Sequence, residues 1–148
     1  MTLRYEILSV TPFRQNCTLI WDDESGEAVL TDVGGDVPFL LQELVNRKLT
    51  LTAIWLTHGH LDHAGGVVEM LKTRKVPVLG PHPDDEFLLQ SLPQTTAQYG
   101  FPSRPPLRRH VGSKKAKRSR SDAMPFKCCI FRAIRRDMSS FIVPRRNC

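Results

Sequence analysis

The sequence predicts an α/β fold with at least part of its sheet parallel. Short apolar segments with strand character alternate with segments of helical apolar spacing over the first two-thirds of the chain, which is the order typical of this class. The segment Leu51–Leu56 is an apolar run, as expected of a strand that is buried on both faces. With 148 residues, the chain is long enough for one domain with its own core.

Three strands are predicted before the first helix. Leu3–Val10 alternates loosely between polar and apolar residues, and Pro12 ends it. Cys17–Trp21 is the second strand, and a polar turn over Asp22–Gly26 leads to the third strand, Ala28–Val33. We therefore expect three consecutive strands at the start of the domain.

A helix is predicted from Asp36 to Lys48. Gly34 and Gly35 break the preceding strand, and Asp36 is able to cap the helix that follows. The apolar residues at helical spacing are Phe39, Leu40, Leu44 and Val45. This spacing indicates an amphipathic helix.

The remaining elements continue the alternation. After the strand at Leu51–Leu56, a second helix is predicted to begin near Ala64. Its apolar positions are Val67, Met70 and Leu71. Val76–Leu79 is predicted to be a short buried strand and Asp84–Leu92 a short helix, and we expect a loop with several prolines over Gln94–Pro106.

The charge of the chain changes sign after Leu107. Residues 1–107 hold eight Lys and Arg against thirteen Asp and Glu, a net charge of −5. Residues 108–148 hold thirteen against two, a net charge of +11, so the overall charge of +6 comes from the tail alone. We predict that residues 1–107 form a partial domain and that residues 108–148 form a basic, disordered tail.

The cysteines and the apolar segments indicate a cytoplasmic protein. Cys17 lies in an apolar strand, where a buried free thiol is expected, while Cys128, Cys129 and Cys148 lack the spacing of a zinc site. No apolar run approaches the roughly 20 residues that a membrane span needs. The N-terminus also lacks a basic region followed by an apolar stretch.

A dense group of metal-ligand residues follows the strand at Leu51–Leu56. His58 and His60 are two residues apart just past the strand end, so both side chains can point to one side and hold one ion. Asp62 and His63 follow within one turn and could face a second ion. This segment has no cysteine, which argues against a closed structural zinc site, because such sites favour thiolates. The spacing therefore predicts a metal centre at the carboxyl end of a buried strand.

These residues carry a resemblance to a known family. Thr-His-Gly-His-Leu-Asp-His-Ala-Gly-Gly, at residues 57–66, resembles the T-H-x-H-x-D-H motif of the metallo-β-lactamase superfamily. Three further segments resemble the glyoxalase II-like (hydroxyacylglutathione hydrolase-like) branch: Asn16–Ile20, Thr31–Asp36 and Val76–Gly80. The resemblance covers residues 3–107 and implies the N-terminal half of an αββα sandwich.

The resemblance also implies roles for particular residues. His58 and His60 would bind the first metal, Asp62 and His63 the second, and Asp62 is the expected catalytic residue. Asp32 would lie beneath the site and steady the loop that carries these ligands, residues 57–63, which we call the metal loop. The alternative is an Asp that only forms a turn. Two Zn²⁺ ions are the expected cofactor, although Fe or Mn also suits mixed His and Asp ligands.

The tail lacks the rest of the family pattern. The resemblance calls for a third histidine on the first metal, from a G-H-T-x-G-H segment, and for a bridging Asp and a late histidine on the second. None of these follows Leu107, and the sequence after His110 is unlike any of them. Like His82, His110 is interpreted as a histidine without a metal.

A change of reading frame would account for this tail. If each codon is re-read from its last base and the first two bases of the next, Cys128–Cys129 must encode Leu. The stretch that continues to Phe141–Ile142 then permits L-H-F-P-G-H-T-P-G-H-V-V-F-Y, and re-reading His110–Asp122 permits a second family-like string. We therefore predict a frameshift near Leu107–Arg109 and little or no activity in this chain.

Two other functions are compatible with the sequence. The basic run Lys114–Arg120 would suit a nucleic-acid-binding arm, but the acidic domain before it argues against a shared nucleic-acid face. The chain could also be a non-catalytic, metal-binding remnant. For the enzyme, the expected partner is a small-molecule thioester or ester substrate, without nucleic acid or membrane.

Overall fold

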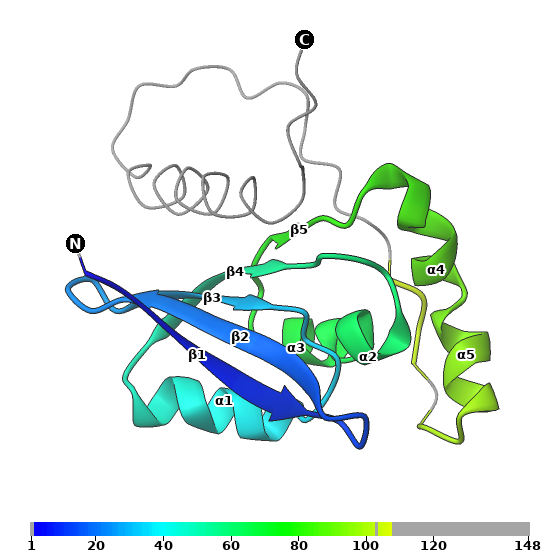
Figure 1. Cartoon of the computed structure of the whole chain (residues 1–148), viewed down its shortest axis with the longest axis horizontal. Helices are drawn as coiled ribbons and strands as arrows, with labels where there is room; N and C mark the ends of the chain where they lie inside the picture. The colour runs from blue at the N-terminus through cyan, green and yellow to red at the C-terminus, as the bar shows by residue number, and fades with distance from the viewer. Residues whose placement is uncertain (1, 103, 108–148) are drawn as a thin grey trace, which may run out of the picture. The chain divides into compact units, whose positions relative to one another are not determined.

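The computed structural model describes residues 2–102 and 104–107. Within these residues, five strands form one sheet in the order β1-β2-β3-β4-β5. The strands are β1 (Leu3–Val10), β2 (Gln15–Asp22), β3 (Glu27–Thr31), β4 (Thr50–Trp55) and β5 (Val78–Leu79). The mixed α/β fold predicted from the sequence is confirmed (Figure 1).

The sheet is antiparallel at one edge and parallel at the other. β1 pairs with β2 and β2 with β3 in antiparallel fashion, whereas β3 pairs with β4 and β4 with β5 in parallel. The parallel part requires crossovers, and helix α1 (Val37–Asn46) supplies the first one between β3 and β4. In this pairing Leu30 lies beside Ile54, and both side chains are fully buried.

The other helices follow β4. They are α2 (Leu61–Ala64), α3 (Val67–Thr73), α4 (Glu86–Gln90) and α5 (Leu92–Gln98), with a 3₁₀ turn over Pro83–Asp85. Figure 1 shows α1, α2 and α3 along one face of the sheet, and α4 and α5 beyond the end of β4.

The core lies between the sheet and α1, α2 and α3. Leu19, Leu30 and Ile54 belong to one buried cluster with Leu44 of α1 and Met70 of α3. Each of these side chains is at most 1% exposed. Burial of such side chains stabilises the fold by about 1.5–3 kcal/mol each, so this layer fixes α1 and α3 against the sheet.

The start of α1 differs from its prediction. Asp36 does not cap the helix through its side chain and has a left-handed backbone conformation with φ 49°. Its Oδ2 instead accepts a hydrogen bond of 2.6 Å from the backbone N–H of Thr11. Leu40 and Leu44 are buried as the amphipathic pattern predicts, but Phe39 and Val45 are 44% and 58% exposed, so the buried stripe is narrower than the apolar residues suggested.

The loop predicted over Gln94–Pro106 is wrong at its beginning, because α5 occupies Leu92–Gln98. Pro93 lies in the first turn of this helix, where its missing N–H costs no hydrogen bond. Leu92 and Thr96, four residues apart, are buried. Two buried positions in a largely polar segment are a weak helical signal.

Several boundaries also move. The third strand ends at Thr31 rather than at Val33, and the last strand is only Val78–Leu79. The helix predicted near Ala64 is two short helices, α2 and α3, separated by Gly65 and Gly66. The helix predicted over Asp84–Leu92 is likewise split into the 3₁₀ turn, α4 and the first residue of α5.

Predictions about the tail fall outside the described residues. They concern the disorder of residues 108–148, the basic run Lys114–Arg120, His110 and the three later cysteines. Leu107, at the predicted boundary, is 6% exposed and belongs to the core cluster. Among residues 2–102 and 104–107, no helix has both the length and the apolar character needed to cross a membrane.

Candidate metal centre

The predicted ligands lie at one edge of the sheet. β3 and β4 are parallel, so their carboxyl ends meet at the same edge, where α/β sheets usually carry their functional groups. Asp32 directly follows β3, and the segment from Thr57 to His63 follows β4 and enters α2. Because β2 runs antiparallel to β3, its first residue, Gln15, starts from this edge too.

The four predicted ligands are close together. The ring centroid of His58 lies 4.7 Å from that of His60 and 3.9 Å from that of His63. The carboxylate Oδ2 of Asp62 lies 3.6 Å from Nε2 of His63. His82, which the sequence assigns no metal, has a side chain that is 72% exposed, and its Nδ1 lies 3.3 Å from Oδ2 of Asp84.

Asp32 connects the end of β3 to the loop that carries the histidines. Its Oδ1 accepts a 2.8 Å hydrogen bond from the backbone N–H of Thr57, and its Oδ2 accepts a 2.9 Å bond from the Thr57 hydroxyl. Its Oδ2 also lies 3.4 Å from Nδ1 of His63. Asp32 is only 6% exposed and has a φ of 50°. These contacts tie the residue after β3 to the residue before His58.

Gln15 is a site residue that the sequence did not indicate. Its side-chain Nε2 donates to the backbone carbonyl of Asn16 at 2.5 Å and lies 3.3 Å from Nδ1 of His63. The residue is 8% exposed, and its Oε1 is buried without a hydrogen-bond partner. The only sequence signal is its position before Asn16–Ile20, because 48 residues separate it from His63.

Comparison with known proteins decides the family. A family profile described as the metallo-beta-lactamase superfamily matches residues 10–118. The chain belongs to the metallo-β-lactamase superfamily. The resemblance inferred from residues 57–66 is therefore confirmed.

Curated relatives narrow the comparison within the superfamily. The chain is 41% identical over 101 residues to the hydroxyacylglutathione hydrolase GloC of Haemophilus influenzae, a match that covers 68% of this chain and 47% of GloC. It is 40% identical over 75 residues to a hydroxyacylglutathione hydrolase of Hahella chejuensis, covering 51% of this chain and 29% of that enzyme. The chain thus spans about half the length of these relatives or less.

Two solved structures are similar to this chain in fold. The BLEG-1 B3 metallo-beta-lactamase superposes with a TM-score of 0.62 and 28% identity, covering 76% of this chain and 55% of that one. TTHA1623, solved in a di-iron-bound form, gives a TM-score of 0.61 and 28% identity, covering 71% and 52%.

The side chains of the cluster are of the types that bind the metal ions of the superfamily. Three imidazoles and a carboxylate suit Zn²⁺, Fe or Mn. Within the part of the chain that the structure describes, however, no group of three or more His, Cys, Asp or Glu side chains is arranged to hold an ion by itself. The residues fit such a metal in chemical type.

The electrostatics favour a neutral His58. Burial lowers the pKa of His58, and the neighbouring His63 and His60 lower it further, against the opposite effects of Asp32 and Asp62. His58 is therefore neutral near pH 7, and the neutral imidazole is the form that binds a metal. Its Nδ1 lies 2.9 Å from the Thr57 hydroxyl.

Cys17 is close to the site and is not a ligand candidate. Burial, and then the negative charge of Asp32, raise the pKa of the Cys17 thiol to about 12. The thiol is fully buried and free, as the sequence predicted. A metal would need the thiolate, which this environment disfavours.

Glycine allows the metal loop to pack directly on the end of β3. A Cβ atom on Gly34 would lie 1.6 Å from the backbone carbonyl oxygen of Asp62, so no side chain fits there. A Cβ on Gly66 would lie 2.9 Å from the backbone nitrogen of Gly35, and the Gly66 N–H donates to the Val33 carbonyl at 2.9 Å. Backbone contacts and Asp32 therefore fix the position of the loop.

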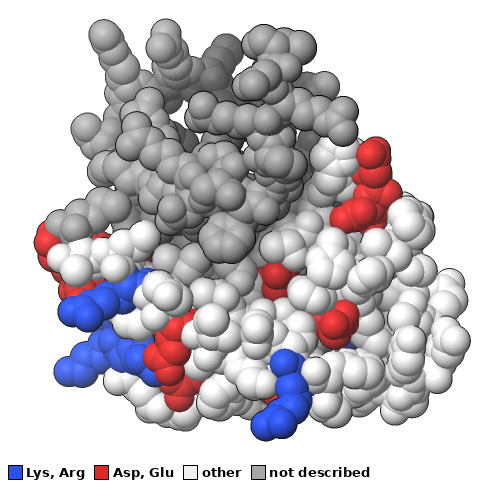
Figure 2. Space-filling view, in the orientation of Figure 1, with Lys and Arg blue, Asp and Glu red and all other residues white. Residues whose placement is uncertain are grey.

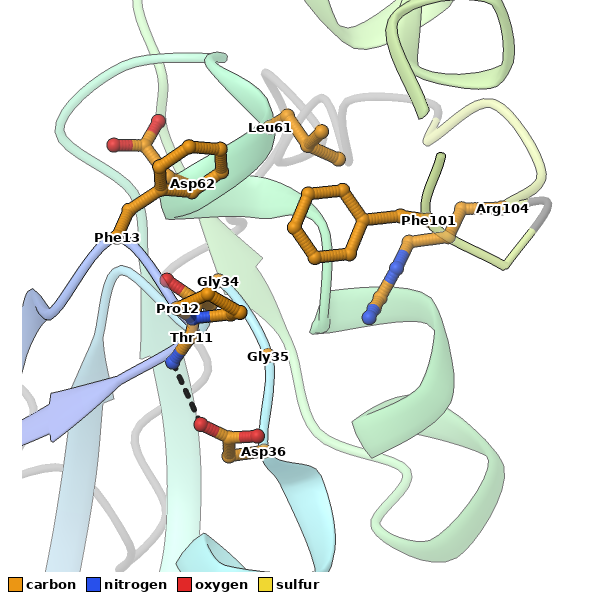
Figure 3. A pocket seen from close by; sticks show the side chains of 10 residues that line it. All are labelled: Thr11, Pro12, Phe13, Gly34, Gly35, Asp36, Leu61, Asp62, Phe101 and Arg104. Carbon is orange, nitrogen blue, oxygen red and sulfur yellow. Dashed lines mark hydrogen bonds between the residues drawn. The ribbon is translucent and has the colours of Figure 1, made fainter. Parts of the chain in front are cut away.

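Two cavities adjoin the cluster. The larger, of about 310 Å³, is lined by Phe13, His60, Leu61, Asp62, Thr95 and Tyr99. The smaller, of about 260 Å³, is shown in Figure 3. Its lining includes Thr11, Gly35, Asp36, Phe101 and Arg104, and it shares Phe13, Leu61 and Asp62 with the larger cavity.

Proposed function

We propose that the protein is a metal-dependent hydrolase that cleaves thioesters, as its hydroxyacylglutathione hydrolase relatives are named for doing. The observation that carries the proposal is the cluster of three imidazoles and Asp62 past the end of β4, on a loop bonded to Asp32. The membership of the superfamily and the identity to GloC support it.

Each residue of the cluster has its own proposed role. His58 and His60 would hold one metal ion, and Asp62 and His63 a second. When bound, such metal ions lower the pKa of a coordinated water to about 7 and polarise the substrate carbonyl. Asp32, through its two bonds to Thr57, holds the ligand loop in place. Asp62 borders both cavities, which supports its proposed role beside the substrate.

We also propose that this chain is impaired. Two histidines do not complete a tetrahedral first site, so we expect weak metal binding and slow turnover. The proposed cause is the frameshift near Leu107–Arg109. Sequencing the coding DNA tests it: a frame around Cys128–Phe141 that does not encode a G-H-T-x-G-H-type segment would refute the frameshift.

Nothing in the described residues favours the nucleic-acid alternative. On the face shown in Figure 2, Lys and Arg side chains of the described residues do not merge into a basic patch. Two arginines of the described residues are paired with carboxylates: Arg4 lies 2.6 Å from Asp23, and Arg47 lies 2.6 Å from Glu6 and 3.0 Å from Glu43.

Metal binding by the full chain is the direct test. Equilibrium dialysis against zinc should show weak binding that is lost in His58→Ala and His60→Ala. His82→Ala is the matched control, because this histidine is exposed and lies outside the cluster. Hydrolysis of S-lactoylglutathione should then be metal-dependent and slow. Zinc binding that survives both cluster variants, or turnover unaffected by chelation, would refute the proposal.

A further inference from the structure

Three aromatic side chains form a rim beside the metal cluster. We call Phe13, Tyr99 and Phe101 the aromatic rim. Phe13 comes from the loop between β1 and β2, and the other two follow α5. The ring centroid of Phe13 lies 5.9 Å from that of Tyr99, edge to face, and 5.7 Å from that of Phe101. Segments far apart in the sequence are thus joined through aromatic contacts.

The rim is unusually open to solvent for such apolar groups. Phe13 is 51% exposed and Tyr99 is 59% exposed. Exposed apolar side chains that gather next to a polar cluster mark a ligand surface more often than scattered ones do. The rim is therefore suited to contact a ligand as well as to hold the two segments together.

The 310 Å³ cavity connects this rim to the metal cluster. His60 and Asp62 lie at its polar side, and Phe13, Leu61 and Tyr99 supply its apolar side. A volume of this size falls at the lower end of the roughly 300–1,000 Å³ found for small-molecule sites. It exceeds the need of a three-carbon acyl group such as lactoyl.

The 260 Å³ cavity is less suited to a ligand. Figure 3 shows Arg104 beside it, beyond Phe101. The Arg104 guanidinium already donates to the Gly65 carbonyl and lies 3.9 Å from a carboxylate oxygen of Glu69. The Asp36 carboxylate is likewise bonded to Thr11, as the dashed line in Figure 3 marks. Both charged groups already bond to other parts of the protein, so they are less available to a ligand.

We propose that the 310 Å³ cavity binds an aromatic group next to the scissile bond, so that the preferred substrates are aromatic thioesters. This inference rests on the proposed hydrolase function, whose ligands His60 and Asp62 border the cavity. An aromatic group entering there meets the rings of Phe13 and Tyr99, and aromatic pairs prefer the edge-to-face geometry that these two rings already adopt. Asp62 disfavours an anionic group at the polar side, so the bound group is uncharged.

The aromatic group could belong to the acyl part or to the thiol part of the substrate. Two neutral probes separate these sources: phenylacetamide mimics the acyl side, and benzyl methyl sulfide mimics the thiol side. Lactamide is the small-acyl comparison. None of the three needs a metal ion, so a failure of this inference leaves the hydrolase proposal standing, and a failure of metal binding leaves this test informative.

The experiment is saturation-transfer NMR on the full metal-free chain. At least one aromatic probe should bind at millimolar concentration, and lactamide should bind more weakly. Phe13→Ala and Tyr99→Ala should each weaken that binding about fivefold. Phe87→Ala is the matched control, because Phe87 is 66% exposed on α4 and lines neither cavity; it should leave binding unchanged.

Phe13→Leu and Tyr99→Leu guard against a loss of fold, because they keep apolar volume and remove only the ring. They should lose affinity with an unchanged circular dichroism spectrum. Lactamide binding as tightly as both aromatic probes would overturn the proposal. Equal binding by the rim variants and the wild type, or equal loss in Phe87→Ala, would overturn it as well.

Discussion

Removing the carboxylate of Asp32 should destabilise the fold and release the metal loop. Asp32 is 6% exposed and accepts two hydrogen bonds from Thr57, at 2.8 and 2.9 Å. Asp32→Ala leaves the N–H and the hydroxyl of Thr57 without this partner, at about 1–3 kcal/mol for each unpaired group. The φ of 50° adds about 1 kcal/mol for alanine. Because Thr57 is itself exposed, water can replace part of these bonds and the low end of the ranges applies, so we expect a total loss of about 3 kcal/mol.

Asp32→Asn distinguishes the effect of losing the charge on stability from the effect of the positive φ. Asparagine tolerates a positive φ and keeps one oxygen for Thr57, so the expected loss is about 1 kcal/mol. Urea unfolding followed by circular dichroism measures both variants. With an m-value of about 1.5 kcal/mol/M, the midpoint should fall by about 2 M for the alanine variant and about 0.7 M for the asparagine variant.

The control for this prediction is Asp84→Ala, whose side chain is 88% exposed. It should shift the midpoint by less than about 0.3 M, because exposed substitutions rarely change stability by more than about 0.5 kcal/mol. If Asp32→Ala loses no more stability than this control, the two bonds to Thr57 do not hold the loop, and the role assigned to Asp32 is wrong.

Two further predictions concern ionisable groups. Hydrogen bonds from the side chains of Arg4 and then Trp21 lower the pKa of Asp23. The ionised carboxylate therefore stabilises the fold above about pH 4, and this contribution is lost as the pH falls through the lowered pKa. Asp23→Asn should melt earlier than the wild type at pH 6, the difference should narrow as the pH falls below about 4, and a difference that stays constant would contradict this. Burial, and then the Asp32 charge, raise the pKa of the Cys17 thiol to about 12, which leaves a thiolate fraction of about 10⁻⁴ at pH 8. After iodoacetamide treatment, peptide mass spectrometry should find Cys17 unmodified in native buffer and modified in urea. Labelling of Cys17 in the native chain would show that the thiol is accessible.

The strands and the metal motif could be predicted because their signals are local. Leu3–Val10 was predicted with the bounds that the structure has, because its loose alternation ends at a proline-containing turn. The T-H-x-H-x-D-H spacing at residues 57–63 identified the family for the same reason. The parallel part of the sheet followed from the helices between its strands.

The features that the sequence did not reveal depend on contacts between distant segments. Asp36 was expected to cap its own helix, but its carboxylate bonds to Thr11, 25 residues away. Gln15 reaches His63 only because β2, β3 and β4 are paired. Helix α5 was missed because it buries only Leu92 and Thr96, and its packing against α2 and α4 decides its conformation.

The anchoring of the metal loop has a consequence for how new specificities could evolve on this fold. Gly34 holds the loop by backbone contact with Asp62, with no room for any other residue. The side chains of Phe13 and Tyr99, by contrast, are 51% and 59% exposed, so other side chains have room at these positions. Selection can therefore vary these two side chains, and with them the proposed ligand preference, while the backbone contact at Gly34 is kept. A randomised library directed at positions 13 and 99 should yield altered substrate preference, whereas one directed at position 34 should yield only glycine among folded clones.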